Sequence, residues 1–145
     1  MASFAALVAF AGADAVRLQL LKELPSWTHP VGWVLFIGGW WLVYRALRAN
    51  AFAVTVVRVQ DERGHRVVRT GPYAVVRHPM YAAFVLVMVG MGHWLHSTAA
   101  AIGALVPVAF LVTRVVHEER VLRARLPEYV DYAATVRWRM LPGVW

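Results

Sequence analysis

Four apolar stretches, separated by more polar segments, constrain the fold of this chain more than any other feature of its sequence. They cover residues 3–21, 31–47, 80–96 and 98–116. A helix needs about 20 apolar residues to cross the hydrocarbon layer of a bilayer, because each residue adds only about 1.5 Å. Each stretch approaches that length. The sequence therefore predicts an all-α, polytopic integral membrane bundle of about four transmembrane helices.

The overall composition supports a membrane protein. Apolar residues make up 60% of the chain and charged residues 16%, whereas a soluble domain is nearer half apolar and about a quarter charged. The chain has no cysteine, which excludes a disulfide-stapled secreted scaffold. The net charge of +7 would suit nucleic acid, but the basic residues fall between apolar stretches, where they favour anionic headgroups. We expect membrane lipids as partners and no nucleic acid.

The distribution of the basic residues predicts the orientation. Seven lie within residues 45–77 and six within 114–145, while the turn around Ser97 has none. Since Arg and Lys are enriched in cytoplasmic loops, the loop 48–79 and the helical tail 117–145 are predicted to face the cytoplasm. We expect one domain over residues 1–145, multi-pass in the cytoplasmic (inner) membrane if the chain is bacterial, with its active site facing the cytoplasm.

Single residues predict local features of these helices. Asp14 and Arg17 are three residues apart in the first stretch, so they could pair on one helical face. Pro107 is predicted to kink the fourth stretch, because it removes a backbone donor. Pro127 is predicted to break the tail helix, leaving a short amphipathic helix from Glu128 to about Arg137. Gly90-Met91-Gly92 in the third stretch is predicted to permit close helix packing.

Two polar clusters flank the hairpin predicted from the third and fourth stretches. The first is Gly71–Tyr81 and the second is Arg114–Leu122. A short outer turn brings the inner ends of the two helices to one level, so we expect six side chains to lie close together: Arg77, His78, Tyr81, Arg114, Glu118 and Glu119. Ionisable groups at membrane depth are costly, which makes this cluster a candidate functional site. The alternative is two structural helix-end pairs, Arg114 with Glu118 and Glu119 with Arg123.

Other chemistries have little support in the sequence. It contains no HExxH or cysteine-based metal pattern, no Gly-rich loop after a predicted strand, and no GxSxG. We therefore predict no metal site.

An ordered series of short motifs covers roughly His65 to Pro142. In chain order they are His65 with Val67-Val68, Gly71-x-Tyr73, Arg77-His78-Pro79-x-Tyr81, Arg114, Glu118-Glu119, Leu122, Tyr129-x-x-Tyr132, Val136 and Pro142. This series resembles the integral membrane methyltransferases of the isoprenylcysteine carboxyl methyltransferase and phospholipid methyltransferase superfamily. The chain departs from the family's usual pattern at Ala83, where Gly is common, and at Leu126-Pro127, where Phe-Gly is usual.

The resemblance implies S-adenosylmethionine as the cofactor, held between the last membrane helices and the cytoplasmic tail. Carried over by motif, the cofactor-binding residues are His65, Arg66, Val67, Val68, Tyr73, Arg77, His78, Pro79, Met80, Tyr81 and Glu118. The catalytic residues carried over are Arg114, Glu118 and Glu119, with Arg114 also binding the substrate.

The resemblance further implies methyl transfer to a lipophilic or prenylated acceptor that enters from the bilayer. A prenylcysteine-type carboxylate is favoured, because the Arg114 guanidinium can bind a carboxylate through two hydrogen bonds. A phospholipid amine and a small thiol stay open as acceptors, as does a homo-oligomer whose second subunit completes the acceptor site. A non-catalytic membrane scaffold or small transporter subunit is the competing interpretation.

Overall fold

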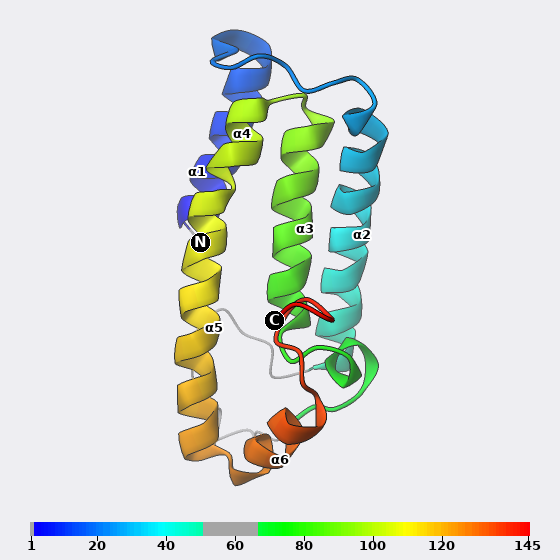
Figure 1. Ribbon diagram of the computed structural model, residues 1–145, viewed down its shortest axis with the longest axis vertical. Coiled ribbons are helices and arrows are strands. Elements are labelled where there is room, and N and C mark those ends of the chain that lie inside the picture. Colours follow the sequence, from blue (N-terminus) through cyan, green and yellow to red (C-terminus); the bar gives the residue numbers. More distant parts are fainter. Residues whose placement is uncertain (1, 51–66) are drawn as a thin grey trace. The chain divides into compact units, whose positions relative to one another are not determined.

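The computed structural model describes residues 2–50 and 67–145, and this part of the chain is helical (Figure 1). Its α-helices are α1 (Ala2–Ala13), α2 (Thr28–Ala49), α3 (Pro79–Trp94), α4 (Thr98–Gly103), α5 (Leu105–Arg125) and α6 (Pro127–Thr135). A π-helical turn, Asp14–Leu18, follows α1, and a 3₁₀ turn, Gly71–Ala74, lies before α3. Within the described ranges, β-pairing is limited to one parallel bridge between Val76 and Trp138. The all-helical prediction is confirmed.

Prolines and a serine set several helix boundaries. Helices α3 and α6 begin at Pro79 and Pro127, at the first helical position, where a missing N–H costs nothing. The Ser97 hydroxyl caps α4 by accepting the Ala100 N–H at 2.9 Å. The helix after Ser97 is interrupted at Ala104, three residues before Pro107, whose ring clashes with the carbonyl four positions back. The predicted break at Pro127 is present, and the irregular turn at Ala104 lies where Pro107 is predicted to kink the helix.

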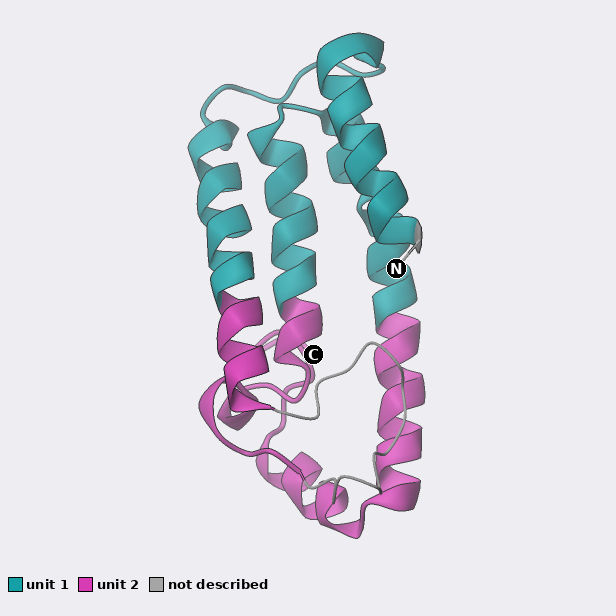
Figure 2. Cartoon of the chain, turned by 180° about the vertical axis from the view of Figure 1, so that it is seen from behind, with its two compact units in different colours: residues 1–41, 83–111 teal, residues 42–82, 112–145 magenta. Residues whose placement is uncertain are grey.

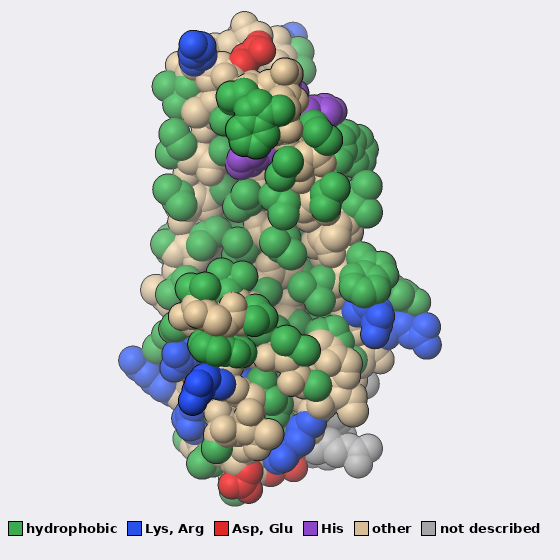
Figure 3. Space-filling model, turned by 45° about the vertical axis from the view of Figure 1, so that its right-hand side comes forward, with side chains coloured by type: hydrophobic (Ala, Val, Ile, Leu, Met, Phe, Trp, Pro, Cys, Tyr) green, Lys and Arg blue, Asp and Glu red, His purple; other side chains and the backbone are tan. Residues whose placement is uncertain are grey.

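Among residues 2–50 and 67–145, two helical segments are long and apolar enough to cross a membrane, Thr28–Ala49 and Thr98–Arg125. Helix α3 is apolar but shorter, at 16 residues. Hydrophobic side chains cover much of the face in Figure 3, and α2 exposes large apolar residues such as Val34 and Ile37. Apolar surface of this extent is typical of helices that face lipid.

The first predicted span, 3–21, differs from the structure. Regular α-helix ends at Ala13, and the chain turns out of the helix at Gln19, which has a φ of 42°. The cause is the buried Asp14 carboxylate, which accepts the Leu20 N–H at 2.9 Å and the Ser97 hydroxyl at 2.5 Å. Asp14 thus closes the end of the helix and binds Ser97, instead of pairing with Arg17 as the spacing allowed.

The described residues form two compact units that interleave along the sequence (Figure 2). Unit 1 contains residues 1–41 and 83–111, and unit 2 contains residues 42–82 and 112–145. Among the described Arg and Lys residues, all except Arg17 and Lys22 belong to unit 2. One domain over the whole chain stays a prediction.

Unit 1 is held by an apolar core and by close contacts at glycine. Its core residues are Leu7, Ala11, Met88, Met91, Ala100 and Ala104. A Cβ on Gly90 would lie 2.5 Å from the Phe36 nitrogen, and one on Gly92 would lie 2.8 Å from the Ala101 Cα. Only glycine lets these backbones approach so closely. The predicted role of Gly90 and Gly92 in helix packing is confirmed.

Candidate active site

The candidate site lies within unit 2, where the start of α3, the end of α5 and the segment 136–145 meet. Backbone hydrogen bonds attach that segment to the residues before α3. The Arg77 N–H donates to the Trp138 carbonyl at 2.9 Å, and the His78 N–H donates to the Arg139 carbonyl at 2.8 Å. Every backbone donor that leaves water needs such a partner. These bonds fix the position from which the Arg77 and His78 side chains extend.

Glu119 is the centre of a buried polar cluster, which we call the Glu119 cluster: Arg77, His78, Glu119, Tyr129 and Arg139. Its Oε1 accepts Arg77 Nε at 2.7 Å and lies 3.3 Å from His78 Nε2 and 3.4 Å from the Tyr129 hydroxyl. Its Oε2 accepts Arg139 Nε at 3.1 Å. Both carboxylate oxygens are thus occupied by donors from the chain, which offsets the cost of burying the charge.

Arg77 links this cluster to the backbone of the segment after α6. Its Nη1 donates to the Val136 carbonyl at 2.7 Å and to the Arg137 carbonyl at 2.8 Å. The Arg77 guanidinium therefore links the residues just before α3 to helix α5 and to the segment after α6. A planar group with five donors in a fixed fork suits this task in a way that lysine does not. The contacts give Arg77 and Glu119 a positioning role.

A second polar group, the Glu118 row, consists of Arg114, Tyr81 and Glu118. The Tyr81 hydroxyl donates to Glu118 Oε2 at 2.6 Å and accepts from Arg114 Nε at 2.9 Å. The Arg114 guanidinium carbon also lies 5.8 Å from the centre of the Tyr81 ring. All three residues are half-buried, so their polar atoms can meet a ligand from outside the chain.

His78 connects the two groups. Its ring stacks on the Tyr81 ring, with centroids 5.7 Å apart and planes at 19°, while its Nε2 faces Glu119. Glu118 and Glu119 are neighbours in sequence, about 100° apart around the helix, and this rotation gives them different partners. One carboxylate is enclosed by arginines, and the other lies in a half-buried row with a phenol.

Helix α6 packs its tyrosines against the same region. Leu126, Tyr129, Tyr132 and Val136 form a buried cluster with Val67 packed against it. The Tyr132 hydroxyl donates to the Tyr73 carbonyl at 2.7 Å. Burial raises the pKa of Tyr73, Tyr129 and Tyr132 above the ordinary tyrosine value, because the phenolate form would lose its hydration. These phenols are therefore neutral at physiological pH.

The structure brings together the six residues expected at the mouth of the hairpin: Arg77, His78, Tyr81, Arg114, Glu118 and Glu119. The helix-end pair expected between Glu119 and Arg123 is long, at 4.0 Å. Arg114 and Glu118 meet at the Tyr81 hydroxyl.

Other predicted residues lie around this centre. Tyr73 and Pro79 are buried, while Val67, Val68 and Met80 are partly buried. The Val67 N–H donates to Glu128 Oε1 at 2.8 Å. His65 and Arg66 lie outside the described residues.

Arg139 is the site residue that sequence reasoning missed. It binds Glu119, and its guanidinium carbon lies 5.0 Å from the centre of the Trp145 ring. No helical spacing relates it to Glu119, which is 20 residues earlier. The available signal was its place in an arginine-rich segment just before Pro142. Among residues 2–50 and 67–145, no group of three His, Asp or Glu side chains could hold a metal ion.

Comparisons with known proteins identify relatives of this chain. The chain is 32% identical over 83 residues to protein-S-isoprenylcysteine O-methyltransferase B of Arabidopsis thaliana, covering 56% of this chain and 42% of that protein. It is 29% identical over 76 residues to the cobalt-zinc-cadmium resistance protein CzcN of Cupriavidus metallidurans, covering 52% of this chain and 35% of that protein. The chain thus spans less than half the length of these curated relatives.

The fold has a solved counterpart. The structure of the eukaryotic intramembrane Ras methyltransferase, isoprenylcysteine carboxyl methyltransferase, matches 97% of this chain and 52% of its own with a TM-score of 0.78 and 21% identity. This likeness shows a helical membrane fold. The phospholipid methyltransferase family model matches residues 27–128, which is more than half of the chain. The protein therefore belongs to the phospholipid methyltransferase family.

Proposed function

We propose that this protein is a multi-pass membrane methyltransferase that uses S-adenosylmethionine and modifies a lipophilic acceptor at the cytoplasmic face. The observation that carries the proposal is the Glu118 row, in which a half-buried carboxylate, phenol and guanidinium meet beside the His78 ring. Family membership and the likeness to an isoprenylcysteine O-methyltransferase support it.

The chemistry of the row suits this cofactor. When bound, S-adenosylmethionine supplies a methyl group on an electrophilic sulfonium. The Glu118 carboxylate can bind the ammonium of a methionyl group or the hydroxyls of a ribose. The aromatic faces of His78 and Tyr81 attract cations. By resemblance to the family motifs, the other residues proposed to line the cofactor pocket are His65, Arg66, Val67, Val68, Tyr73, Arg77, Pro79 and Met80.

We assign Arg114 the role of binding the methyl acceptor. A guanidinium binds a carboxylate through two parallel hydrogen bonds, which aligns the acceptor oxygen. A carboxylate is already ionised at neutral pH, so the chain needs only to orient it and exclude water. The prenylcysteine-type carboxylate is therefore the favoured acceptor.

An amine acceptor would need a base, and the geometry makes Glu119 a poor one. Its two oxygens already accept from Arg77 and Arg139 and face His78 and Tyr129. We therefore assign Glu119 a positioning role, in place of proton transfer.

Cofactor binding tests the proposal directly. Calorimetry with S-adenosylmethionine on detergent-purified protein should give saturable binding in wild type, lost in Glu118→Gln. Asp131→Asn serves as the matched control, because Asp131 is an exposed acid outside the site. Circular dichroism checks that all three proteins keep their helices. No binding by folded wild type, or equal binding by Glu118→Gln, would contradict the proposal and favour the scaffold.

Transfer of a radiolabelled methyl group identifies the acceptor class. An S-farnesylcysteine analogue, phosphatidylethanolamine and a small thiol form the three arms. A base-labile methyl ester on the first is the expected product. Label on the lipid amine or the thiol alone would reassign the acceptor while keeping the methyltransferase.

Orientation is testable because the native chain contains no cysteine. Glu23→Cys and Asp131→Cys each introduce one exposed thiol, and a membrane-impermeant maleimide applied to intact cells should label only the first. Labelling of Asp131→Cys in intact cells would overturn the cytoplasmic placement of the site.

A further inference from the structure

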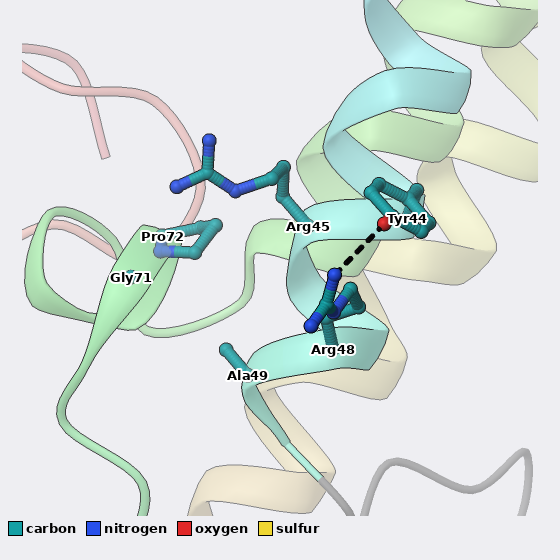
Figure 4. A pocket seen from close by; sticks show the side chains of 6 residues that line it. All are labelled: Tyr44, Arg45, Arg48, Ala49, Gly71 and Pro72. Carbon is teal, nitrogen blue, oxygen red and sulfur yellow. Dashed lines mark hydrogen bonds between the residues drawn. The ribbon is translucent and has the colours of Figure 1, made fainter.

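We propose that a cavity at the C-terminal end of α2 binds the phosphate of a membrane phospholipid. The cavity has a volume of about 410 Å³ and lies within unit 2 (Figure 4). Its lining comes from the last turns of α2 and from the 3₁₀ turn before α3: Tyr44, Arg45, Arg48, Ala49, Gly71 and Pro72. It shares no residue with the Glu119 cluster or the Glu118 row.

The charge of the cavity selects an anion. Arg45 and Arg48 are three residues apart on one helix, so they share a face, and no acidic residue is among the six that line the cavity. Figure 4 shows Arg45 extending from α2 toward Gly71 and Pro72. Two planar guanidinium groups around one space offer forked donors to a tetrahedral oxyanion. Phosphate matches them, because its tetrahedral oxygens can accept from both guanidinium groups at once.

Tyr44 positions one of the two arginines and gives the cavity an apolar side. Its hydroxyl accepts Arg48 Nη1 at 3.1 Å, and the Arg48 guanidinium carbon lies 5.9 Å from the ring centre. The Tyr44 side of α2 is open, with Tyr44 52% exposed and Leu47 47% exposed. A polar recess beside exposed apolar side chains suits a ligand with a phosphate and an acyl chain.

The backbone at Gly71, which lies close to Ala49, forms another side of the cavity. Gly71 has a φ of 60°, and a Cβ there would lie 3.3 Å from the Ala49 Cβ. Glycine adopts this conformation without strain, so the loop can reach the end of α2. The cavity is therefore formed by the backbone of two segments as well as by the two arginine side chains.

The position along α2 favours a lipid as the source of the phosphate. Helix α2 has 22 residues, which at 1.5 Å each give about 33 Å, slightly more than the thickness of the hydrocarbon layer. Arg45 and Arg48 in its last two turns then lie at headgroup depth, where lipid phosphates are concentrated. This inference does not rest on the proposed methyl transfer, because the binding is measured without cofactor.

Calorimetry on detergent-purified protein with three probes tests the site. Dioctanoyl phosphatidylglycerol carries phosphate and chains, dioctanoylglycerol carries chains alone, and glycerol 3-phosphate carries phosphate alone. Wild type should bind the first at least tenfold more tightly than either of the others. Equal binding of dioctanoylglycerol would overturn the phosphate site, and equal binding of glycerol 3-phosphate would overturn the lipid source.

Matched variants then assign the binding to this cavity. The double variant Arg45→Ala/Arg48→Ala should lose at least tenfold in affinity for phosphatidylglycerol. The control Arg120→Ala/Arg125→Ala removes the same charge from exposed positions on α5, Arg125 being in its last turn, and should bind as wild type does. Equal losses in both pairs would show general attraction to basic charge and overturn the site. Circular dichroism checks folding, and Arg48→Lys, which keeps the charge and loses the fork, should show an intermediate loss.

Discussion

Arg77 Nε donates a 2.7 Å hydrogen bond to Oε1 of Glu119, a residue 42 positions later in the chain, and both side chains are almost fully buried. A buried ion pair contributes little net stability compared with an apolar pair, but the loss of one partner leaves an uncompensated charge. This pair therefore makes the geometry of the candidate site dependent on the folding of unit 2.

Arg77→Ala is expected to lower the free energy of unfolding by about 3–5 kcal/mol, because Glu119 keeps its charge and loses its nearest donor. Denaturant titration in detergent, followed by circular dichroism, measures the change. Arg120→Ala, at an exposed position on α5, should shift the curve by less than about 0.5 kcal/mol. Equal curves for the two variants would contradict the structural role of Arg77.

Tyr81→Phe separates the shared hydroxyl from the aromatic ring. The variant keeps the stack on His78 but removes the oxygen that joins Glu118 and Arg114. If the proposed function holds, kcat/KM should fall by about 100-fold, a typical cost of losing one positioned polar group in an active site. The helical content should be unchanged. A rate near that of wild type would remove Tyr81 from the site.

Two glycines of unit 1 provide a matched test of helix packing. A Cβ on Gly90 would lie 2.5 Å from the Phe36 nitrogen and 2.8 Å from the Gly32 carbonyl oxygen, whereas nothing lies within 4 Å of one on Gly38. Gly90→Ala should cost about 1–3 kcal/mol through overpacking. Gly38→Ala should be neutral or stabilising, because alanine favours the helix. Thermal unfolding in detergent compares them, and the reverse order would contradict the packing.

Alkaline pH should destabilise unit 2. The pKa values of Tyr73, Tyr129 and Tyr132 are raised by burial, so the folded state keeps its protons where the unfolded state releases them. This contribution to stability is present below the ordinary tyrosine pKa of about 10 and decreases as pH rises above it. Phenolate absorbance and circular dichroism, titrated in parallel, should change together above that pH. Full ionisation of the tyrosines in the ordinary range, with no loss of helix, would contradict the burial.

The positions of single residues predicted several parts of the fold. Pro127 marks the break before α6, and Pro107 lies just after the interruption at Ala104. Both effects are local, since proline acts on its own backbone and on the preceding turn. The end of α1 could not be predicted in this way. It depends on Asp14 meeting Ser97, which is 83 residues away.

The candidate site, too, could be predicted from the sequence only in part. The proximity of His78 and Tyr81 to Glu118 and Glu119 followed from a short hairpin between two apolar stretches. The different partners of the two glutamates did not follow, because their spacing allows either to face α3. The approach of Arg139 to Glu119 also has no local sequence signal.

The sequence by itself determined the helical membrane class, through the lengths of its apolar stretches, and the motif residues that gather beside α3 and α5. Only the tertiary structure decided that Glu119 is enclosed by Arg77 and Arg139 while Glu118 binds Tyr81. Hydrophobic periodicity and helix-breaking residues act over a few positions, so they can be recognised in the sequence. The burial of a charge depends on donors brought together by the whole of unit 2, and no local pattern carries that information.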